Sequence, residues 1–583
     1  MTRLLLSGVF KPFGVQDDTT ESLCTMELLN NQVTREQGIH SPRSNNPSFA
    51  LYLMGENIHV PVTVLDFPSW EEFTKEIDSG TYTHVGISFI GPNILKAGRM
   101  AAYVRSRSSR TKIILGGHGT AIPELRTLVD CDEICHGEGV SWLRKYFGED
   151  ADQPIIHPVV PSAINSFIYG APIMGKAGII IPGVGCQNSC RFCATSHKFD
   201  RQYTPFLRTG RDIFAACRKS EEKIGVDDFG LMDENFCKDP YRARQLLEEM
   251  EKHGKAYTFS TFSSAETITR LGADFLLRLG VNFLWIGVES KVHLFEKTKG
   301  IDLHDLIADL QDHGITVLAS AILFLEHHDK ETIHEDIDWA IGLESDLLQF
   351  MELGPTPGTR LYQDYEASGK IIAGIPWPRK HGQDEIWFHH PHFTLPETAS
   401  YLRDAFIKKY LTHGPGVLNM AMTAIKGYLK VKAEIAEREK AGLTWDPKTL
   451  QYVPGNHPGP DAFMQRRLDS IKRNALRFRP ALSTTLKYAP NAQAAEKCRK
   501  VMALYHDAFG PMTFPERAKS LAVRLLAVRE SLRMRKEGVV MRQPPTNRIT
   551  YRDKTLKLGT GDCAVAIPPI VRQSEMEATI RSV

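Results

Sequence analysis

Residues 185–193 read Gly-Cys-Gln-Asn-Ser-Cys-Arg-Phe-Cys, so Cys186, Cys190 and Cys193 follow the spacing CxxxCxxC. Three thiolates on one short loop can hold three irons of a cubane cluster and leave the fourth iron open to a small molecule. The apolar run Gly178–Pro182 just before the loop is typical of a buried strand. Because α/β barrels carry their active sites at the carboxyl ends of strands, the loop predicts a chemical rather than a structural site.

A structural zinc site is the alternative interpretation, because zinc takes four Cys or His ligands and His197 could supply the fourth. No second paired cysteine motif follows in the sequence, however. Phe192, directly before the last cysteine, fits an iron–sulfur loop better. A CxxxCxxC loop with an aromatic residue in this slot resembles the radical SAM superfamily (S-adenosylmethionine enzymes). That resemblance implies a [4Fe-4S] cluster on Cys186, Cys190 and Cys193, which would be the catalytic centre.

Length and composition restrict the classes of protein to which the chain can belong. The chain has 583 residues, which suggests roughly two to four domains. A net charge of +2 gives no argument for nucleic acid, and ten cysteines in so long a chain are not a disulfide framework. The first residues lack the apolar length of a signal peptide, and no apolar run reaches the ~18 residues that span a bilayer. We therefore expect a soluble cytoplasmic protein.

Short apolar runs alternate with helix-length spacers near the amino terminus, which predicts a parallel, doubly wound sheet. The runs are Leu4–Ser7, Val62–Leu65, Val85–Phe89, Ile113–Leu115 and Glu133–Cys135. Glycine-rich turns follow the last three runs, at the edge where open α/β sheets bind ligands. Glycine is also common after parallel strands simply because the turn needs it.

A Rossmann-like domain with these turns, directly before a radical SAM core, resembles the cobalamin-binding radical SAM class. The first turn lacks the GxGxxG of dinucleotide sites, and the DxHxxG motif that carries a cobalt ligand in many cobalamin proteins is absent. The lower face of cobalt is therefore left open, and His118 is expected to pack beside the cofactor. The residues that the resemblance assigns to cobalamin are Ser88, Gly91, Gly116, Gly117, His118, Gly119, Gly137, Glu138 and Gly139.

Six further strand-like runs with helical spacers fit a partial (β/α) barrel of the radical SAM type. They are Gly178–Pro182, Phe229–Met232, Tyr257–Thr261, Phe283–Gly287, Thr316–Ile322 and Leu347–Glu352. The family's Gly-Gly-Glu is replaced here by Met232-Asp233-Glu234, and Asp233 or Glu289 could instead cap the next helix. The residues that the resemblance assigns to SAM are Phe192, Asp233, Glu234, Ser260, Ser263, Glu289 and Ser290.

The amino-acid composition of the chain changes after the predicted barrel. The histidine- and aromatic-rich stretch 381–393 could hold a metal, but it lacks HExxH or paired spacing, so its histidines are interpreted as loop histidines. Its position after the barrel would suit a lid over substrate. The basic helices that follow would ordinarily be a solvated face, and docking to a membrane surface or an anionic substrate is the sharper hypothesis. The expected α/β organisation is a cobalamin domain at 1–150, a linker at 151–175, a radical SAM barrel at 176–395, a mostly helical domain at 396–545 and a flexible tail at 546–583.

The resemblance implies an activity. A cobalamin-dependent radical SAM enzyme would form a 5′-deoxyadenosyl radical and pass a methyl group from methylcobalamin to an unactivated carbon. The alternatives are cyclisation or carbon–carbon bond formation without methyl transfer, and a non-catalytic cobalamin or iron–sulfur sensor. The expected partners are a small-molecule, lipid or peptide substrate and an electron donor such as flavodoxin or ferredoxin, with no nucleic acid.

Overall fold

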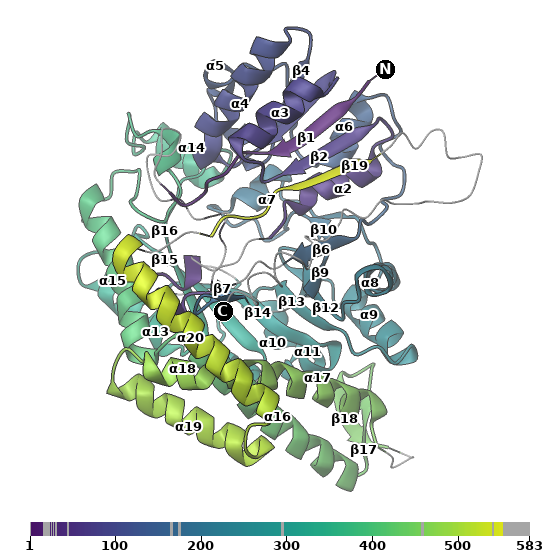
Figure 1. Cartoon of the computed structure of the whole chain (residues 1–583), viewed down its shortest axis with the longest axis vertical. Coiled ribbons are helices and arrows are strands. Elements are labelled where there is room, and N and C mark those ends of the chain that lie inside the picture. The colour runs from purple at the N-terminus through teal and green to yellow at the C-terminus, as the bar shows by residue number, and fades with distance from the viewer. Residues whose placement is uncertain are drawn as a thin grey trace.

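The computed structural model describes residues 2–551, except 16–23, 25, 27, 29–31, 43–45, 164–166, 173–175, 293–296, 456–459 and 539–541. Two mainly parallel sheets lie one above the other in Figure 1, and a helical region covers the far side of the second sheet. The expected α/β class, with its mainly helical carboxyl-terminal part, is confirmed.

The first sheet has the strand order β19-β2-β1-β3-β4-β5, in which β1 to β5 run parallel. Order 2-1-3-4-5 is that of the flavodoxin-like sheet, whose ligand site lies where the order reverses, between β1 and β3. β1 and β2 are buried on both faces, which explains why their sequences, LLLSG and VTVLD, are mostly apolar rather than alternating. The strands are β1 (Leu4–Gly8), β2 (Val62–Asp66), β3 (His84–Ser88), β4 (Lys112–Gly116) and β5 (Glu133–Ile134).

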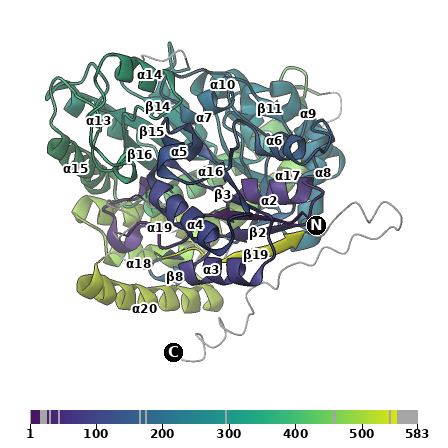
Figure 2. The same ribbon diagram turned by 90° about the horizontal axis from the view of Figure 1, so that it is seen from above.

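Helices cover this sheet on both faces (Figure 2). The capping box of α3, in which Ser69 and Glu72 exchange hydrogen bonds, is one local reason that the chain turns into a helix after β2. The helices are α2 (Phe49–Asn57), α3 (Trp70–Ser79), α4 (Ile94–Arg107), α5 (Leu125–Leu128) and α6 (Gly139–Tyr146), with the 3-10 turns η1 (Gly38–His40), η2 (Gly91–Asn93) and η3 (His118–Ala121).

The sixth strand of this sheet corrects the prediction of a flexible tail from residue 546. β19 (Asn547–Tyr551) pairs antiparallel with β2, and Tyr551 lies opposite Val62. Figure 1 shows this yellow strand beside the purple ones. The short alternating sequence Asn-Arg-Ile-Thr-Tyr covers an edge that β2 would otherwise expose. Residues 552–583 lie outside the described part of the chain.

The second sheet has the order β16-β15-β14-β13-β12-β9-β6, and its first six strands are parallel. The six predicted barrel strands therefore exist, as β9 (Lys176–Ile180), β12 (Asp228–Leu231), β13 (Thr258–Phe262), β14 (Val281–Glu289), β15 (Thr316–Leu323) and β16 (Leu347–Glu352). The helices between or beside them are α7 (Ala194–Lys198), α8 (Gly210–Ile224), α9 (Pro240–Lys252), α10 (Ala265–Leu271), α11 (Ala273–Leu279), α12 (Leu303–Asp312), α13 (Thr332–Gly342) and α14 (Arg360–Ala367), with the 3-10 turns η4 (Phe236–Lys238) and η5 (Trp377–Arg379).

The segment expected as a linker, 151–175, also contains strands. β6 (Val160–Ala163) pairs antiparallel with β9 and so forms the edge of the barrel sheet. A small hairpin follows, made of β7 (Phe167–Ile168) and β8 (Ala171–Pro172). A further two-stranded pair, β10 (Gly183–Val184) with β11 (Thr204–Pro205), flanks the cysteine loop.

A buried arginine helps to fix the helical region to the amino-terminal ends of β13 and β14. Arg467 donates to the carbonyl oxygens of Tyr257 at 2.6 Å and of Arg278 at 3.2 Å, and also to those of Ala256 and Leu279. Five donors in a fixed fork suit such a cluster of backbone acceptors. The elements are α15 (Leu395–His413), α16 (Gly416–Lys440), β17 (Leu443–Asp446), β18 (Gln451–Pro454), α17 (Ala462–Phe478), η6 (Arg479–Ala481), α18 (Leu482–Lys487), α19 (Ala492–Phe509) and α20 (Phe514–Glu537).

The long insert between β1 and β2 reaches the barrel. Gln32 accepts a hydrogen bond from Gln349 on β16 at 3.0 Å, and Gln37 accepts one from the amide of Gly416 at 3.0 Å. His40 hydrogen bonds to the carbonyl oxygen of Tyr488 at 2.8 Å. The insert thus ties the first sheet to the second sheet and to the helical region.

Candidate active site

The cysteine loop has a tightly determined backbone. Gly185 has φ of +90°, and a Cβ added there would collide with the carbonyl oxygen of Gln202. The Ser196 hydroxyl donates to the carbonyl oxygen of Cys186 at 2.9 Å, and the amide of Cys193 donates to that of Cys190 at 3.0 Å. α7 begins directly after Cys193. The loop therefore presents three cysteines from a fixed turn at the carboxyl end of β9.

All three cysteines are half-buried, and burial raises the pKa of each thiol. Lys297 opposes this effect at all three thiols, because its positive charge favours the thiolate. The ammonium group also lies 5.9 Å from the ring centroid of Phe192. The sequence alone does not indicate Lys297, because no local motif connects it to a loop that lies about a hundred residues earlier.

Glu289 brings Lys297 to the cysteines. The two side chains form an ion pair, with Glu289 only 5% exposed. Burial would lower the pKa of Lys297, but the charges of Glu289 and Cys190 outweigh it and raise that pKa. Glu289 has φ of +60° at an irregularity in the pairing of β14 with β15, and a side chain at Gly287 would collide with its carboxylate. Such strained positions occur mainly at functional sites.

Asp233 and Glu234 have different surroundings. The carboxylate of Asp233 is buried and accepts hydrogen bonds from Arg242 at 2.8 Å, Tyr203 at 2.6 Å and the amide of Asn235 at 3.0 Å. Among the described residues, Glu234 has no hydrogen-bonding partner and its side chain is exposed. Although Glu234 is open to solvent, the protein atoms around it partly desolvate the carboxylate, and together with the charge of Asp233 they raise its pKa to about 7. Glu234 is thus the member of the pair that can still receive a ligand.

The serines predicted to bind SAM also differ in whether their hydroxyl groups already bond to the protein. The Ser263 hydroxyl donates to the side-chain oxygen of Asn235 at 2.8 Å, and the Ser290 hydroxyl accepts from the amide of Val292 at 3.2 Å. Ser260 is half-buried on β13, on the same face as Phe262. Phe262 stacks on Trp285 of β14 with ring centroids 5.2 Å apart. This face of the barrel therefore offers an aromatic surface beside a hydroxyl group.

A row of polar side chains crosses the same face, and the sequence alone did not indicate it. The indole nitrogen of Trp285 donates to the Ser320 hydroxyl at 2.6 Å, and Ser320 donates to Gln349 at 2.9 Å. Gln349 donates in turn to Gln32 of the insert at 3.0 Å. These four residues come from β14, β15, β16 and the insert, so only the tertiary structure brings them together.

The predicted cobalamin turns fall into two groups. A Cβ at Gly117 or Gly119 would collide with Phe89, and one at Gly139 would lie 2.6 Å from the sulfur of Met54, so internal packing already explains these glycines. A Cβ at Gly91, Gly116 or Gly137 would meet no atom within 4 Å. Glu138 caps α6 by accepting from the amides of Val140 and Ser141. Ser88 is half-buried at the end of β3, next to the place between β1 and β3 where the strand order reverses.

The cysteine loop and the turn after β4, which contains Gly116 and Gly117, meet at α7. Lys198 donates to the carbonyl oxygen of Gly117 at 2.8 Å and to the Thr120 hydroxyl at 3.2 Å. His118 contacts the Thr195 hydroxyl at 3.5 Å, and burial, with the nearby charge of Lys198, lowers its pKa to about 4. The carboxyl-terminal edges of the two sheets, which carry the two predicted cofactor sites, therefore lie against each other.

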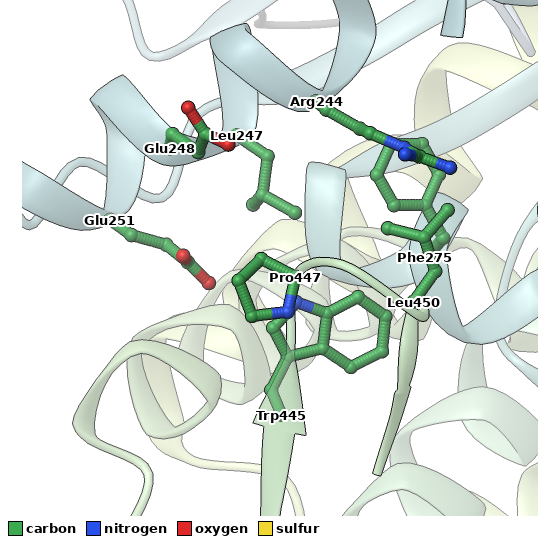
Figure 3. Close-up of a pocket in the computed structure, with 8 residues that line it drawn as sticks. All are labelled: Arg244, Leu247, Glu248, Glu251, Phe275, Trp445, Pro447 and Leu450. Atoms are coloured by element: carbon green, nitrogen blue, oxygen red, sulfur yellow. The ribbon is translucent and has the colours of Figure 1, made fainter. Parts of the chain in front are cut away.

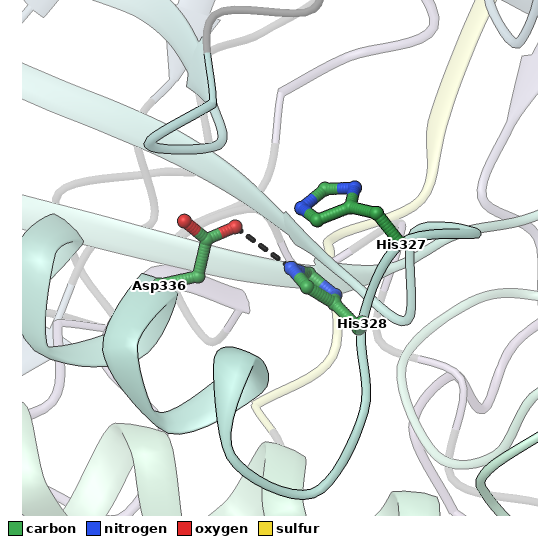
Figure 4. Close-up of side chains that lie close together, drawn as sticks. All are labelled: His327, His328 and Asp336. Atoms are coloured by element: carbon green, nitrogen blue, oxygen red, sulfur yellow. Dashed lines mark hydrogen bonds and ion pairs between the residues drawn. The ribbon is translucent and has the colours of Figure 1, made fainter.

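Two other groups of side chains do not join this site. His328 accepts a hydrogen bond from the amide of Leu325 through Nδ1. Its Nε2 therefore donates to Asp336 at 2.7 Å, the contact that the dashed line in Figure 4 marks. Both ring nitrogens are thus used, which leaves no lone pair for a metal although His327 is nearby. The pocket in Figure 3 lies under Trp445 on the outer helical layer, between α9, α11 and the β17–β18 hairpin.

The stretch interpreted as a lid is part of the core. Ile386, Phe388 and Phe393 are buried in the barrel core. The indole of Trp387 donates to the carbonyl oxygen of Pro355 at 3.3 Å, and His390 bonds to that of Leu325 at 3.1 Å. Apolar side chains inside the core hold this segment against the barrel rim, so the lid interpretation is wrong. His197, the alternative zinc ligand, uses Nδ1 to bond the carbonyl oxygen of Cys193 at 3.0 Å.

Two curated proteins are similar in sequence. An uncharacterised methyltransferase of Pyrococcus horikoshii is 23% identical over 364 residues, which are 56% of this chain and 78% of that protein. The anaerobic magnesium-protoporphyrin IX monomethyl ester cyclase of Cereibacter sphaeroides is 24% identical over 350 residues, 56% of this chain and 54% of the cyclase. No family model matches the chain.

The comparisons include one protein of the class that the sequence resembles, and it is found among the solved structures. Both curated relatives have the names of enzymes, which agrees with the expectation of an enzyme. Among solved structures, the radical S-adenosylmethionine methyltransferase TsrM from Kitasatospora setae, with cobalamin and a [4Fe-4S] cluster bound, aligns over 82% of this chain and 99% of its own. That alignment has a TM-score of 0.46 and 13% identity.

Proposed function

We propose that this protein is a cobalamin-dependent radical SAM enzyme that methylates an unactivated carbon. The observation that carries the proposal is the contact of α7 with the turn after β4. Through Lys198 and Gly117, the helix that follows the cysteine loop is fixed to the edge proposed for the corrinoid. Two cofactors held at facing edges can act on one substrate in sequence while water is kept out.

The cysteines fit a [4Fe-4S] cluster. Cys186, Cys190 and Cys193 supply three thiols on one rigid turn, and Lys297 favours their thiolate forms. Glu234 and Glu289 lie close enough to the thiols to disfavour ionisation, so both carboxylates border the same space. When bound, the cluster with SAM supplies reductive cleavage of the sulfonium, and cobalamin supplies a methyl carrier.

We assign residues to SAM and to the corrinoid according to whether their polar atoms already bond to the protein. Glu234 has an exposed carboxylate for the SAM ammonium group, while Phe192, Ser260 and the Glu289–Lys297 pair border the same site. We assign Asp233, Ser263 and Ser290 to holding these residues in place, because their polar atoms bond to neighbouring protein groups. On the corrinoid side, the open spaces at Gly91, Gly116 and Gly137 suit a close approach of the cofactor.

The substrate would lie over the stacked rings of Phe262 and Trp285, where the polar row Ser320–Gln349–Gln32 can accept or donate hydrogen bonds. This surface suits a small molecule, lipid or peptide with an apolar part next to a polar group. A small one-electron protein such as flavodoxin or ferredoxin would deliver the electron.

The test is anaerobic purification and reconstitution of the full chain with iron, sulfide and cobalamin. We expect absorbance near 400 nm and formation of 5′-deoxyadenosine from SAM under reducing conditions. Cys190→Ala should abolish both, whereas Cys131→Ala, a half-buried cysteine outside the loop, should retain both.

Each failure identifies a different alternative. A cluster without 5′-deoxyadenosine formation would favour the sensor, and zinc without iron would favour the structural site. A product with an unchanged carbon count would favour cyclisation, the reaction named for one curated relative. A gain of one CH2 in the product supports methylation.

A further inference from the structure

The outer face of α20 is apolar although the helix lies on the surface. Phe514, Leu521, Leu525 and Leu532 are 77%, 58%, 55% and 60% exposed. At 3.6 residues per turn, these four positions fall within about 40° of one another around the helix axis. A continuous apolar row on a surface marks an interaction site more often than four scattered side chains do.

Positive charge borders this row on both sides. Among the exposed side chains of α20, Glu537 is the acidic one, while the basic ones are Arg517, Lys519, Arg524, Arg529, Arg535 and Lys536. The other two acidic residues of the helix are turned inward. Glu516 pairs with Arg479 at 3.3 Å, and Glu530, which is 6% exposed, pairs with Arg533 at 2.6 Å.

The opposite face of α20 packs closely against the rest of the protein. Ser520 and Ala527 are buried, and the helix passes so close to the β7–β8 hairpin that a Cβ at Gly170 would lie 2.9 Å from the Cβ of Glu530. Figures 1 and 2 show α20 running along the outside of the helical region. Because this packed face fixes the rotation of the helix about its axis, the apolar row is directed away from the protein.

We propose that the outer face of α20 docks the protein onto a bilayer that carries anionic headgroups. The leucines and Phe514 would enter the boundary between headgroups and acyl chains, while the flanking arginines pair with phosphates. Among the described residues, no helix is both long and apolar enough to cross a membrane, so α20 lies on the bilayer and does not span it. This inference is independent of the proposed cofactors.

Charge argues against two other occupants. A second copy of the chain would bring two basic faces together with a single exposed acid, Glu537, on each helix. The segment 552–583 contains five basic and four acidic residues, so it has no negative charge to spare for this face. An anionic lipid surface is the occupant whose charge complements α20.

The test is co-sedimentation of the full chain with vesicles of phosphatidylcholine alone or mixed with phosphatidylglycerol. We expect binding to the anionic vesicles that weakens steeply as ionic strength rises from about 0.05 to about 0.5 M, because salt screens exposed charges. The double change Leu521→Ser with Leu525→Ser should weaken binding roughly tenfold or more. Arg524→Gln with Arg529→Gln should weaken it by a similar factor.

Matched changes on other elements serve as controls. Leu128→Ser with Leu411→Ser alters two leucines that are 47% and 45% exposed, and Arg110→Gln with Arg208→Gln alters two exposed arginines. Both controls should bind as the wild type does. Equal binding to neutral and anionic vesicles would overturn the proposal, as would α20 variants that bind like the wild type. Self-association that is lost with Leu521→Ser would overturn it in favour of a second copy.

Discussion

Lys297 is the charged side chain that the cluster cysteines share. Replacing it by alanine removes one positive charge that favours the thiolates, so the reduced and more negative state of the cluster should become less stable. We predict that Lys297→Ala lowers the midpoint potential of the reconstituted cluster by roughly 60 mV, which corresponds to about 1.4 kcal/mol in a one-electron couple. A redox titration followed by electron paramagnetic resonance measures this shift.

Lys297→Arg is the matched control, because it keeps the charge beside Glu289 and should leave the potential within about 20 mV of the wild type. An unchanged potential in Lys297→Ala would show that the ammonium group does not act on the cluster. Iron content measured in parallel separates a shift in potential from a loss of the cluster.

Neighbouring glycines after β4 should respond in opposite ways to the same change. Gly117 has φ of +87° and a Cβ there would collide with Phe89, so Gly117→Ala should lower the stability of the protein by about 2 kcal/mol or more. Gly116→Ala meets open space and should leave the melting temperature unchanged while it weakens corrinoid binding.

Thermal unfolding without cofactor and a titration with hydroxocobalamin measure these two effects separately. If Gly116→Ala binds cobalamin as tightly as the wild type, the space at this turn is not part of the corrinoid site. If Gly117→Ala is as stable as the wild type, the turn is less constrained than its contact with Phe89 indicates.

At the scale of elements, η1 is held by a histidine that must stay neutral. His40 is 1% exposed, and burial lowers its pKa to about 4, although its bond to the Tyr488 carbonyl opposes this. The unfolded chain gains the proton near pH 6.5, so the stability contributed by neutral His40 is present above pH 6.5 and is lost progressively as pH falls toward 4. The full effect is about 3 kcal/mol.

We predict that His40→Gln is less sensitive to acid than the wild type. Urea unfolding between pH 7 and pH 4.5 should show a smaller loss of stability in the variant, since glutamine can still bond to the Tyr488 carbonyl but does not titrate over this range. Equal losses in the two proteins would mean that other buried groups dominate the acid response.

The sequence predicted the parallel elements well because each has a local signature. Apolar runs such as Val62–Leu65 and Leu347–Glu352 identify buried strands by themselves. β19 was missed because Asn-Arg-Ile-Thr-Tyr has too few apolar residues to identify a strand without its partner. The lid was mistaken for a similar reason, since aromatic residues such as Trp387 and Phe388 can lie in a core or on a surface loop.

The residues of the candidate site also fall into two groups, those that a local sequence motif identifies and those that only the fold brings together. The cysteines could be found from their spacing, because one loop carries all three. Lys297 and the row from Trp285 to Gln32 could not, because their members are distant in sequence and meet only through the fold. Which of Asp233 and Glu234 has a free carboxylate depends on Arg242 and therefore on the tertiary structure.

For the whole molecule, β19 connects the last described residues to the first sheet. A chain that ends before Asn547 leaves β2 as an open edge, which favours pairing with other chains. We predict that such a truncation lowers the melting temperature by several degrees and promotes aggregation. Truncation after Tyr551 keeps the strand and should show neither effect in thermal scans and light scattering.

The pairing of β19 with β2 also has a consequence for synthesis of the protein. The ribosome completes β1 to β5 within the first 134 residues, but the strand that covers the edge of β2 is made more than 400 residues later. Throughout that interval the nascent amino-terminal sheet has an uncovered margin. The amino-terminal sheet is therefore complete only after residue 551 has left the ribosome, and until then the edge of β2 is open to pairing with other chains.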